Sequence, residues 1–519
     1  MLWHPNVNAQ TDGQGTTPPW PQELLHPSSA TPSLDVVDRH GYRRAVTTEH
    51  TNDAAIVAAA IDRARAAQAA IDDYSQEQVD LLVTAIAWAG TRPQTAAHLA
   101  QLAAEQSGLG NASDKTTKIM RKTLGTMADL KDAPSVGVID VDQDRGVTTI
   151  AKPMGVIACI LPSTNPGATP LNNMMITLKG RNAVILAPHP RGEATCAASV
   201  ALARAELAKL GAPEDLVQLV SLAAESKEAG KARAAELLSQ SDYSLVTAGP
   251  ANVDMAYRSG TPSHGVGVGN APVIIDETAD LDAAIPKIVA SKTFDHATSC
   301  SSENALLIDG AVYDQVIARL QDHGGWVVPI DQKGQLQETM WPGGRLNRQI
   351  VAQPAGRIAE VAGFDQPEAH ACRFLIVEEE GVGPDHPFSG EKLSVVLTAY
   401  RTDSFEHALN KVEDILSYMG EGHSCGIHTE VPERAQQLAE RARVSTVLVN
   451  QPHAYNNGGS FDNGLDFTLS MGAGTWGDND TCENLTYKHF LNYTYLATPI
   501  ASTEPTEEEL FGDFLAQRG

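Results

Sequence analysis

The chain has 519 residues, more than a single hydrophobic core usually accommodates, so two or three subdomains are expected. Its formal net charge of -26 at pH 7, without a basic cluster, argues against a nucleic-acid partner. No apolar run approaches the ~20 residues that span a bilayer, and the first residues lack the features of a secretory signal. These features predict a protein of the cytoplasm without a membrane partner.

The first 45 residues are predicted to form a flexible arm. Their start is rich in Pro, Thr, Ser, Gln and Asn, a composition that buries little apolar surface. Trp20, Leu24 and Leu25 offer the alternative of a short peptide that docks on a partner or shell, but a disordered leader is the favoured interpretation. Helices are predicted after the arm over 54–70, 76–90 and 93–107, and nothing in them suggests chemistry. A capping box, Ser75-Gln-Glu-Gln78, precedes the second of these helices.

A first α/β region is predicted from residue 136. Two extended runs around a turn, 136–141 and 147–151, predict a hairpin. Apolar strand candidates then alternate with segments of helical length, a pattern that indicates a parallel sheet. Ligands of such sheets bind beyond the carboxyl ends of the strands. Small and polar residues recur at those ends, as in a nucleotide cleft. The strand candidates are 156–161, 183–186, 216–220 and 244–246, followed by Pro162-Ser163-Thr164-Asn165, Ala187-Pro188-His189, Ser221 and Thr247-Ala248-Gly249.

The glycines at 265, 267 and 269 do not form a dinucleotide-binding fingerprint. They precede a strand, whereas the Gly-x-Gly-x-x-Gly fingerprint opens a helix. A tight backbone passage beside a ligand or another chain is the favoured interpretation.

A second α/β unit follows and contains the candidate nucleophile, Cys300. The cysteine lies in the polar, turn-forming stretch Phe294-Asp-His-Ala-Thr-Ser-Cys-Ser-Ser-Glu-Asn304, between a helix-like run and an apolar strand. A free cysteine is more often a small buried hydrophobe, and this alternative stands beside the catalytic one. The six cysteines form no Cys-x-x-Cys pair, so neither disulfides nor a metal site are expected. Strands are predicted at 273–275, 305–308, 374–377, 393–397 and 446–449, and 487–502 is extended again before an acidic end.

Several separated motifs, in order and spacing, resemble the CoA-acylating branch of the aldehyde dehydrogenase superfamily from about Val46 to Gly512. The resemblance implies an α/β fold with a Rossmann-like cofactor domain, an α/β catalytic domain and an oligomerisation arm. The motifs are Gly155 to Pro166, Leu178 to Ala183, Pro188 to Arg191, Thr247 to Pro250, Gly265 to Pro272, the Cys300 segment, Phe388 to Ser394, Gly422 to Ser424 and Gly472 to Gly477.

The resemblance also implies the chemistry. The Cys300 thiolate would add to an aldehyde, and hydride transfer to NAD or NADP would leave a thioester on the enzyme. The amide of Asn165 and the backbone N–H of Cys300 would hold the oxyanion, although a turn role for Asn165 is the alternative. Glu391 resembles the residue that binds the nicotinamide ribose; a surface glutamate is its alternative. The other cofactor-binding residues that the resemblance implies are Pro162, Ser163, Thr164, Pro188, His189, Thr247, Gly249 and Leu393.

The differences from the hydrolytic branch of the family indicate CoA as the acyl acceptor. That branch has a glutamate that activates water, where Val266 or Gly267 stands here. Without this base, an acyl-enzyme waits for a thiol, which needs less activation than water because its pKa is about 8.5. The lysine on the adenosine ribose is also replaced by Ala187-Pro188-His189-Pro190, where His189 either contacts a nucleotide or serves as a turn residue.

Two histidines are candidates for contact with the substrate or for acid/base work. His296 replaces the usual Asn of the acylating branch close to the nucleophile and is expected to shape an anionic or polar substrate pocket. His423 resembles a family histidine with an acid/base or CoA-contact role, and a hydrogen-bonded structural histidine is the alternative. The Cys300 segment is similar to that of members acting on sulfoacetaldehyde, with propionaldehyde and acetaldehyde as competing substrates.

These inferences combine into a division of the chain and a set of partners. The expected partners are a small aldehyde and CoA, within a homodimer or homotetramer. The alternatives are a non-acylating aldehyde dehydrogenase, a cysteine hydrolase or acyltransferase without nicotinamide, and a scaffold or shell-binding component of a bacterial microcompartment. The expected parts are a flexible arm at 1–45, an NAD(P)- and CoA-binding domain at 46–270 with its hairpin at 136–152, a catalytic domain at 271–455, and a C-terminal return and oligomerisation arm at 456–519.

Overall fold

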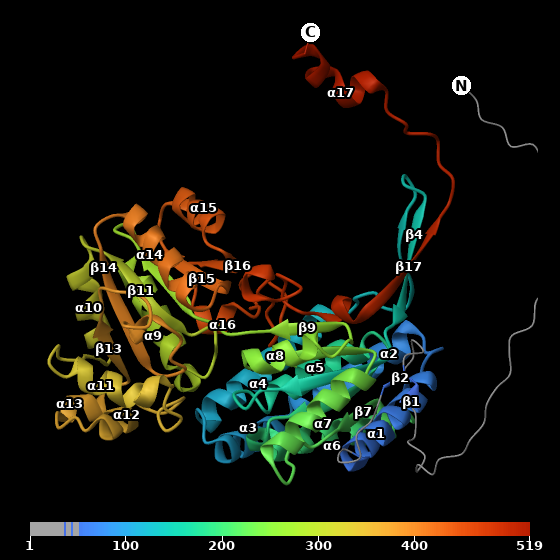
Figure 1. The fold of residues 1–519 in the computed structure, drawn as a ribbon, viewed down its shortest axis with the longest axis horizontal. Coiled ribbons are helices and arrows are strands. Elements are labelled where there is room, and N and C mark those ends of the chain that lie inside the picture. The colour runs from blue at the N-terminus through green and yellow to red at the C-terminus, as the bar shows by residue number, and fades with distance from the viewer. Residues whose placement is uncertain (1–35, 38–42, 45–50, 519) are drawn as a thin grey trace, which may run out of the picture. The chain divides into compact units, whose positions relative to one another are not determined.

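The computed structural model describes residues 36–37, 43–44 and 51–518. The chain divides into two units, 1–51 and 52–519. In the first unit, β1 (Val36–Val37) and β2 (Arg43–Arg44) pair antiparallel. The rest of the predicted arm, with its candidate docking peptide, lies outside the described residues. The second unit contains the two large sheets and their helices (Figure 1).

Helices form the start of the second unit, as predicted. The capping box is confirmed, because the Ser75 hydroxyl accepts the N–H of Gln78 and the Gln78 side chain accepts the N–H of Ser75. The sequence reading missed a further helix, which begins after Asn111; the side chain of Asn111 accepts the N–H of Asp114. The helices are α1 (Thr51–Ala69), α2 (Gln76–Gly90), α3 (Pro93–Ser107) and α4 (Ala112–Leu130).

A five-stranded parallel sheet follows, in the order β7-β6-β5-β8-β9. From β5 the chain continues to β6 and then to β7 at one edge of the sheet. It then crosses to the other side of β5, where β8 pairs with β5. The loops after these two strands therefore flank a topological switch point, where ligands of open α/β sheets bind. Four strands match the prediction. The fifth, β9, was missed because its Ser-His-Gly-Val sequence is polar at the start. The elements are β5 (Val156–Leu161), α5 (Ala168–Leu178), β6 (Ala183–Pro188), α6 (Glu193–Lys209), β7 (Val217–Leu219), α7 (Lys227–Gln240), β8 (Tyr243–Thr247), α8 (Pro250–Tyr257) and β9 (Ser263–Val266).

The second sheet has seven parallel strands in the order β12-β13-β14-β11-β10-β15-β16. All five predicted strands are present, whereas β12 and β15 were missed. The elements are β10 (Ala271–Ile275), α9 (Leu281–Thr293), β11 (Glu303–Asp309), α10 (Tyr313–Asp322), β12 (Gly325–Val327), α11 (Lys333–Met340), α12 (Ala355–Ala362), α13 (Pro367–Ala371), β13 (Phe374–Glu378), β14 (Val396–Thr402), α14 (Phe405–Tyr418), β15 (Gly422–His428), α15 (Pro432–Arg441), β16 (Val444–Val449) and α16 (His453–Asn456).

The predicted hairpin is β3 (Gly137–Asp142) and β4 (Val147–Pro153). Near the C-terminus, β17 (Leu491–Ala497) pairs with β4 along its whole length, and Figure 1 shows the two side by side. The acidic end forms α17 (Glu507–Ala516), which the sequence reading missed although Thr506 and Glu509 make a capping box. Pairing of this arm with another subunit stays a prediction.

Buried apolar side chains gather around each large sheet. One core cluster joins the helical layer to the five-stranded sheet and includes Phe490 and Leu491 from the C-terminal return. Two others pack around the seven-stranded sheet. Among the described residues, no helix is both long enough and apolar enough to span a membrane. The predicted domain boundaries stay a proposal.

Candidate active site

Cys300 and His423 form a pair. Cys300 is partly exposed in the turn before β11, and its Sγ lies 3.2 Å from Nε2 of the buried His423 on β15. The two residues meet because β11 and β15 both flank β10. Close packing beside the nucleophile explains Gly269, since a Cβ there would lie 2.2 Å from the Cys300 carbonyl oxygen.

The pair is neutral at pH 7. Burial lowers the pKa of His423 to about 4. Burial also raises the pKa of the Cys300 thiol, although hydrogen bonds from Ser301 and the charge of Lys118 oppose the increase. Nε2 of a neutral imidazole can accept the thiol proton if Nδ1 carries the ring hydrogen and donates to the Ser424 hydroxyl 2.8 Å away. The geometry therefore supports general-base activation of the cysteine.

The pKa of His423 predicts the acid side of the pH–rate profile. The base-competent neutral form exists above the pKa of about 4 and is lost only as the pH falls through that value. We expect kcat/KM to show no loss of activity centred near pH 6.5, the ordinary pKa of histidine. Initial rates from pH 5 to 8, with activity rechecked after return to pH 7.5, test this. An acid limb near 6.5 that disappears in His423→Gln would contradict it.

Asn165 is held by a buried network of charges. Lys118 Nζ donates to Asn165 Oδ1 at 2.8 Å, so the amide N–H groups are left to donate elsewhere. Lys118 and Lys115 both form ion pairs with Asp295, at 2.7 and 2.9 Å. Burial opposes ionisation of Asp295, but the two lysines lower its pKa to about 2. The network fixes the orientation of the Asn165 amide.

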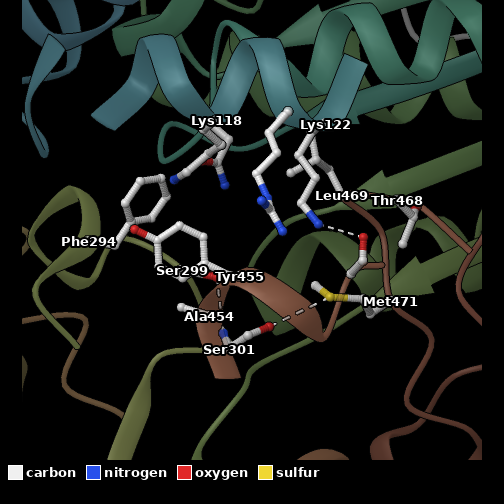
Figure 2. Close-up of a pocket in the computed structure, with 13 residues that line it drawn as sticks. Lys118, Lys122, Phe294, Ser299, Ser301, Ala454, Tyr455, Thr468, Leu469 and Met471 are labelled. Carbon is white, nitrogen blue, oxygen red and sulfur yellow. Dashed lines mark hydrogen bonds between the residues drawn. The ribbon is translucent and has the colours of Figure 1, made fainter. Parts of the chain in front are cut away.

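A small cavity of about 40 Å³ adjoins the nucleophile (Figure 2). It is lined by Ser299 and Ser301, on either side of Cys300, and by Asn165. Figure 2 shows Lys118 and Lys122 extending from α4 toward Tyr455 and Ser301 on the opposite side. The remaining lining residues are Arg121, Phe294, Ala454, Gly458, Thr468, Leu469 and Met471.

Glu391, a predicted cofactor ligand, lies close to the catalytic pair. The backbone N–H of Gly269 hydrogen-bonds its carboxyl group. Burial, reinforced by Cys300, raises the pKa of Glu391 to about 8, so the group is mostly protonated at pH 7.

The other predicted cofactor-binding residues occupy loops at the carboxyl ends of the first sheet. Pro162, Ser163 and Thr164 follow β5, and Pro188 ends β6. The exposed His189 accepts the N–H of Arg191 at 3.1 Å, the contact expected of a turn histidine. Thr247 ends β8 with its hydroxyl 2.9 Å from that of Ser470, and a Cβ added to Gly249 would lie in open space. Leu393 has a φ of 43°, and its carbonyl accepts the N–H of Ala352 at 2.7 Å.

His296 does not line the cavity beside Cys300. It lies in a left-handed run, Asp295 to Ala297, and lines a separate cavity of about 450 Å³. The two cavities share Phe294 and Tyr455 as lining residues. A contact between His296 and the substrate stays a prediction.

A third cavity, of about 840 Å³, is the largest of those described. Gly267, Met419, Gly420 and Trp476 line it, together with residues of α8. Gly267 is one of the two residues at the position of the missing glutamate. It therefore lines a space that is large enough for part of a nucleotide.

Comparison with known proteins identifies the family of the chain. The sequence profile described as "Aldehyde dehydrogenase family" matches residues 26–327, more than half of the chain. The chain belongs to the aldehyde dehydrogenase family. As an aldehyde dehydrogenase, it has a fold of the predicted α/β class.

Several relatives match this chain over nearly their whole length. A sulfoacetaldehyde dehydrogenase (acylating) of Cupriavidus necator is 47% identical over 463 residues, covering 89% of this chain and 93% of the relative. A succinate-semialdehyde dehydrogenase (acetylating) of Clostridium kluyveri is 36% identical, covering 87% and 98%. An acetylating aldehyde dehydrogenase from Geobacillus thermoglucosidasius has a solved structure that matches with a TM-score of 0.83 and 32% identity, covering 89% and 100%. The predicted resemblance to the CoA-acylating branch is confirmed.

The sequence reading missed the cationic face of α4. Lys115, Lys118, Arg121 and Lys122 recur at intervals of three and four residues, which places them on one side of a helix. Lys115, Lys118 and Lys122 are buried, although a lysine is almost never fully buried unless its charge is paired. This spacing was the available signal, but a solvated face would have produced the same pattern.

Proposed function

We propose that this protein is a CoA-acylating aldehyde dehydrogenase, which converts a small aldehyde, CoA and NAD or NADP into an acyl-CoA and the reduced cofactor. The Cys300–His423 pair carries this proposal, because a thiol 3.2 Å from a neutral imidazole is arranged for covalent catalysis.

The chain's own residues perform the covalent steps. His423 accepts the thiol proton as Cys300 Sγ bonds to the aldehyde carbon, and the amide of Asn165 donates to the resulting oxyanion. A bound nicotinamide supplies an acceptor for the hydride that leaves this carbon. The acyl group then remains on Cys300 as a thioester. The sulfur of CoA then bonds to the acyl carbon and the bond between this carbon and Cys300 Sγ breaks, so acyl-CoA leaves. The proton of the CoA thiol passes to Sγ, which restores the Cys300 thiol.

CoA is favoured over water as the acyl acceptor. Val266 and Gly267 supply no proton acceptor at the position of the hydrolytic glutamate. Glu391 is close to the nucleophile, but it is a poor substitute at pH 7 because its pKa is raised to about 8. A thiol needs less help than water, since its own pKa is about 8.5.

The residues present fit a nicotinamide nucleotide. The carboxyl group of Glu391 is suited to accept hydrogen bonds from ribose hydroxyls. The open space at Gly249 and the cavity of about 840 Å³ leave room for a ligand beside the carboxyl ends of the first sheet. Pro162, Ser163 and Thr164 on the β5 loop, together with Thr247, would contribute to the same site. Leu393, Pro188 and His189 stay proposed contacts.

The relatives suggest which aldehydes to test first. Two of them carry the names of enzymes for sulfoacetaldehyde and succinate semialdehyde. Both aldehydes are short and carry an anionic group. Sulfoacetaldehyde is the first candidate substrate, and propionaldehyde is the neutral comparison.

The requirement for CoA is the test of this function. We expect sustained NAD(P)H formation at 340 nm only when aldehyde and CoA are both present, with acyl-CoA detected by mass spectrometry. Without CoA, a burst close to one equivalent per active site should precede a steady rate at least tenfold lower. A steady rate that is independent of CoA would mean that water is activated. Thioester cleavage without NAD(P)H formation would support a hydrolase.

Self-association is proposed through the three-stranded sheet. β3 is one of its two outer strands among the described residues, and it exposes Val138 and Val141 by 59% and 55%. An exposed apolar edge strand is a ready surface for pairing with another chain. A homodimer or homotetramer is therefore expected in light scattering. A role for residues 1–45 in a shell stays a prediction.

A further inference from the structure

The cavity beside Cys300 carries positive charge on one wall only. Lys118, Arg121 and Lys122 come from one face of α4, and the other walls include the side chains of Phe294, Leu469 and Met471. No lining residue of this cavity is a carboxylate. Charges beside apolar walls act in a medium of lower dielectric constant than water, which strengthens their attraction for an anion.

The charges on this wall differ in how they are compensated. Lys118 shares the carboxylate of Asp295 with Lys115. Neither Arg121 nor Lys122 forms an ion pair with a carboxylate among the described residues. Within the described part of the chain, Lys122 Nζ donates only to the backbone carbonyls of Gly458 and Gly459, at 2.5 and 3.1 Å. Two cations thus face the cavity without an anionic partner in direct contact.

Arg121 also has unused hydrogen-bonding capacity. Its terminal nitrogen donates to the Ser460 hydroxyl at 2.6 Å, and Ser460 in turn donates to Asp462. Its Nε is buried and has no hydrogen-bond partner among the described residues. A buried donor without a partner costs free energy, which a ligand with acceptor oxygens would recover. A guanidinium group is well suited to a planar or tetrahedral oxyanion.

The position of these cations matches a short substrate. Lys118 contacts Asn165, which marks the oxyanion end of the cavity. A rise of 1.5 Å per residue places Lys122 about 6 Å further along the axis of α4. An aldehyde whose carbonyl oxygen lies near Asn165 would therefore place a group one or two carbons away near Arg121 and Lys122. The volume of about 40 Å³ leaves little room for a longer chain.

We propose that Arg121 and Lys122 form an anion subsite that binds the terminal sulfonate or carboxylate of a short aldehyde and selects such substrates over neutral aldehydes. This inference rests on the proposed function for its substrate, but the subsite itself can be tested without turnover. Burial, together with Arg121 and Lys118, lowers the pKa of Lys122 to about 7, so about half of this amine is charged at pH 7, and a bound anion would stabilise the charged form.

Substrate selectivity is the first test. In Arg121→Met, kcat/KM for sulfoacetaldehyde should fall by about 30-fold or more, mainly through KM, because a hydrogen-bonded charge contact is lost. For propionaldehyde the fall should be about threefold or less, which also shows that the variant folds. Arg121→Lys should restore part of the selectivity. The exposed Arg345, outside the cavity, offers the charge-matched control Arg345→Met. Equal losses for both aldehydes, or a raised KM for CoA or NADP instead, would overturn the proposal.

Protection of the nucleophile is the second test and needs neither cofactor nor CoA. Ethanesulfonate resembles sulfoacetaldehyde without its carbonyl, and ethanesulfonamide is its uncharged counterpart. Ethanesulfonate should slow alkylation of Cys300 by iodoacetamide at least fivefold in the wild-type protein but not in Arg121→Met. Equal protection by the sulfonamide, or undiminished protection in the variant, would overturn the subsite. Failure of CoA-dependent turnover with protection intact would instead refute the proposed function alone.

Discussion

Replacing Cys300 by alanine is expected to lower kcat/KM for aldehyde oxidation by about 10⁴- to 10⁶-fold, because no other group can carry the acyl intermediate. The burst of NAD(P)H without CoA should vanish as well. Mass spectrometry of the wild-type protein, quenched after the burst, should find the acyl group on the peptide that contains Cys300. These measurements together assign the nucleophile.

Cys372 provides the matched control for this substitution. It is also partly exposed, and its thiol donates to the Ala369 carbonyl at 3.2 Å, away from His423. Cys372→Ala should retain kcat/KM within about threefold and should keep the burst. An acyl adduct found on Cys372, or a burst that survives in Cys300→Ala, would show that the assignment of the nucleophile is wrong.

Replacing His423 by glutamine is expected to lower kcat/KM by about 10²- to 10³-fold at pH 7, the usual contribution of a positioned general base. This corresponds to about 3 to 4 kcal/mol of transition-state stabilisation. Burial raises the pKa of Cys300, so the unassisted thiol is rarely ionised at neutral pH. The variant should therefore recover activity as the pH rises and hydroxide removes the proton, while the wild-type profile stays flatter.

Ser424→Ala separates base catalysis from orientation. Ser424 contacts only the far nitrogen of the imidazole, Nδ1, so its loss should cost about three- to tenfold without the alkaline recovery. Iodoacetamide alkylation at pH 7.5 should slow markedly in His423→Gln and little in Ser424→Ala. Alkylation and turnover that are both unaffected by His423→Gln would leave His423 with a structural role only.

Local patterns predicted much of the fold. Apolar runs separated by segments of helical length were sufficient for four strands of the first sheet, because a buried parallel strand must be apolar on both faces. The strands that the sequence did not predict lack such an apolar run. β15 reads Gly-His-Ser-Cys-Gly-Ile-His and is wholly buried beside β10. Its burial depends on neighbours far away in the chain, which no local pattern records.

The sequence predicts the nucleophile but left its base open. The polar turn around Cys300 and the accompanying motifs favour this residue, whereas His423 had a structural alternative of equal standing. The strand order β11-β10-β15 brings the two within 3.2 Å, across 123 positions of sequence. His296, only four residues from Cys300, lies in the left-handed run Asp295 to Ala297 and lines a different cavity.

The sequence by itself determined the α/β class and the absence of the hydrolytic glutamate, because both depend on residue type and order along the chain. The tertiary structure alone decided the protonation of the site and the charge around it. Burial sets the pKa of His423 and Glu391, and the packing of α4 against the nucleophile turn places Arg121 and Lys122 in the cavity. Burial away from water, and contact between charged residues that are far apart in the sequence, arise only in the folded chain. The pKa values of the site and the charge of the cavity wall therefore could not be predicted from the sequence.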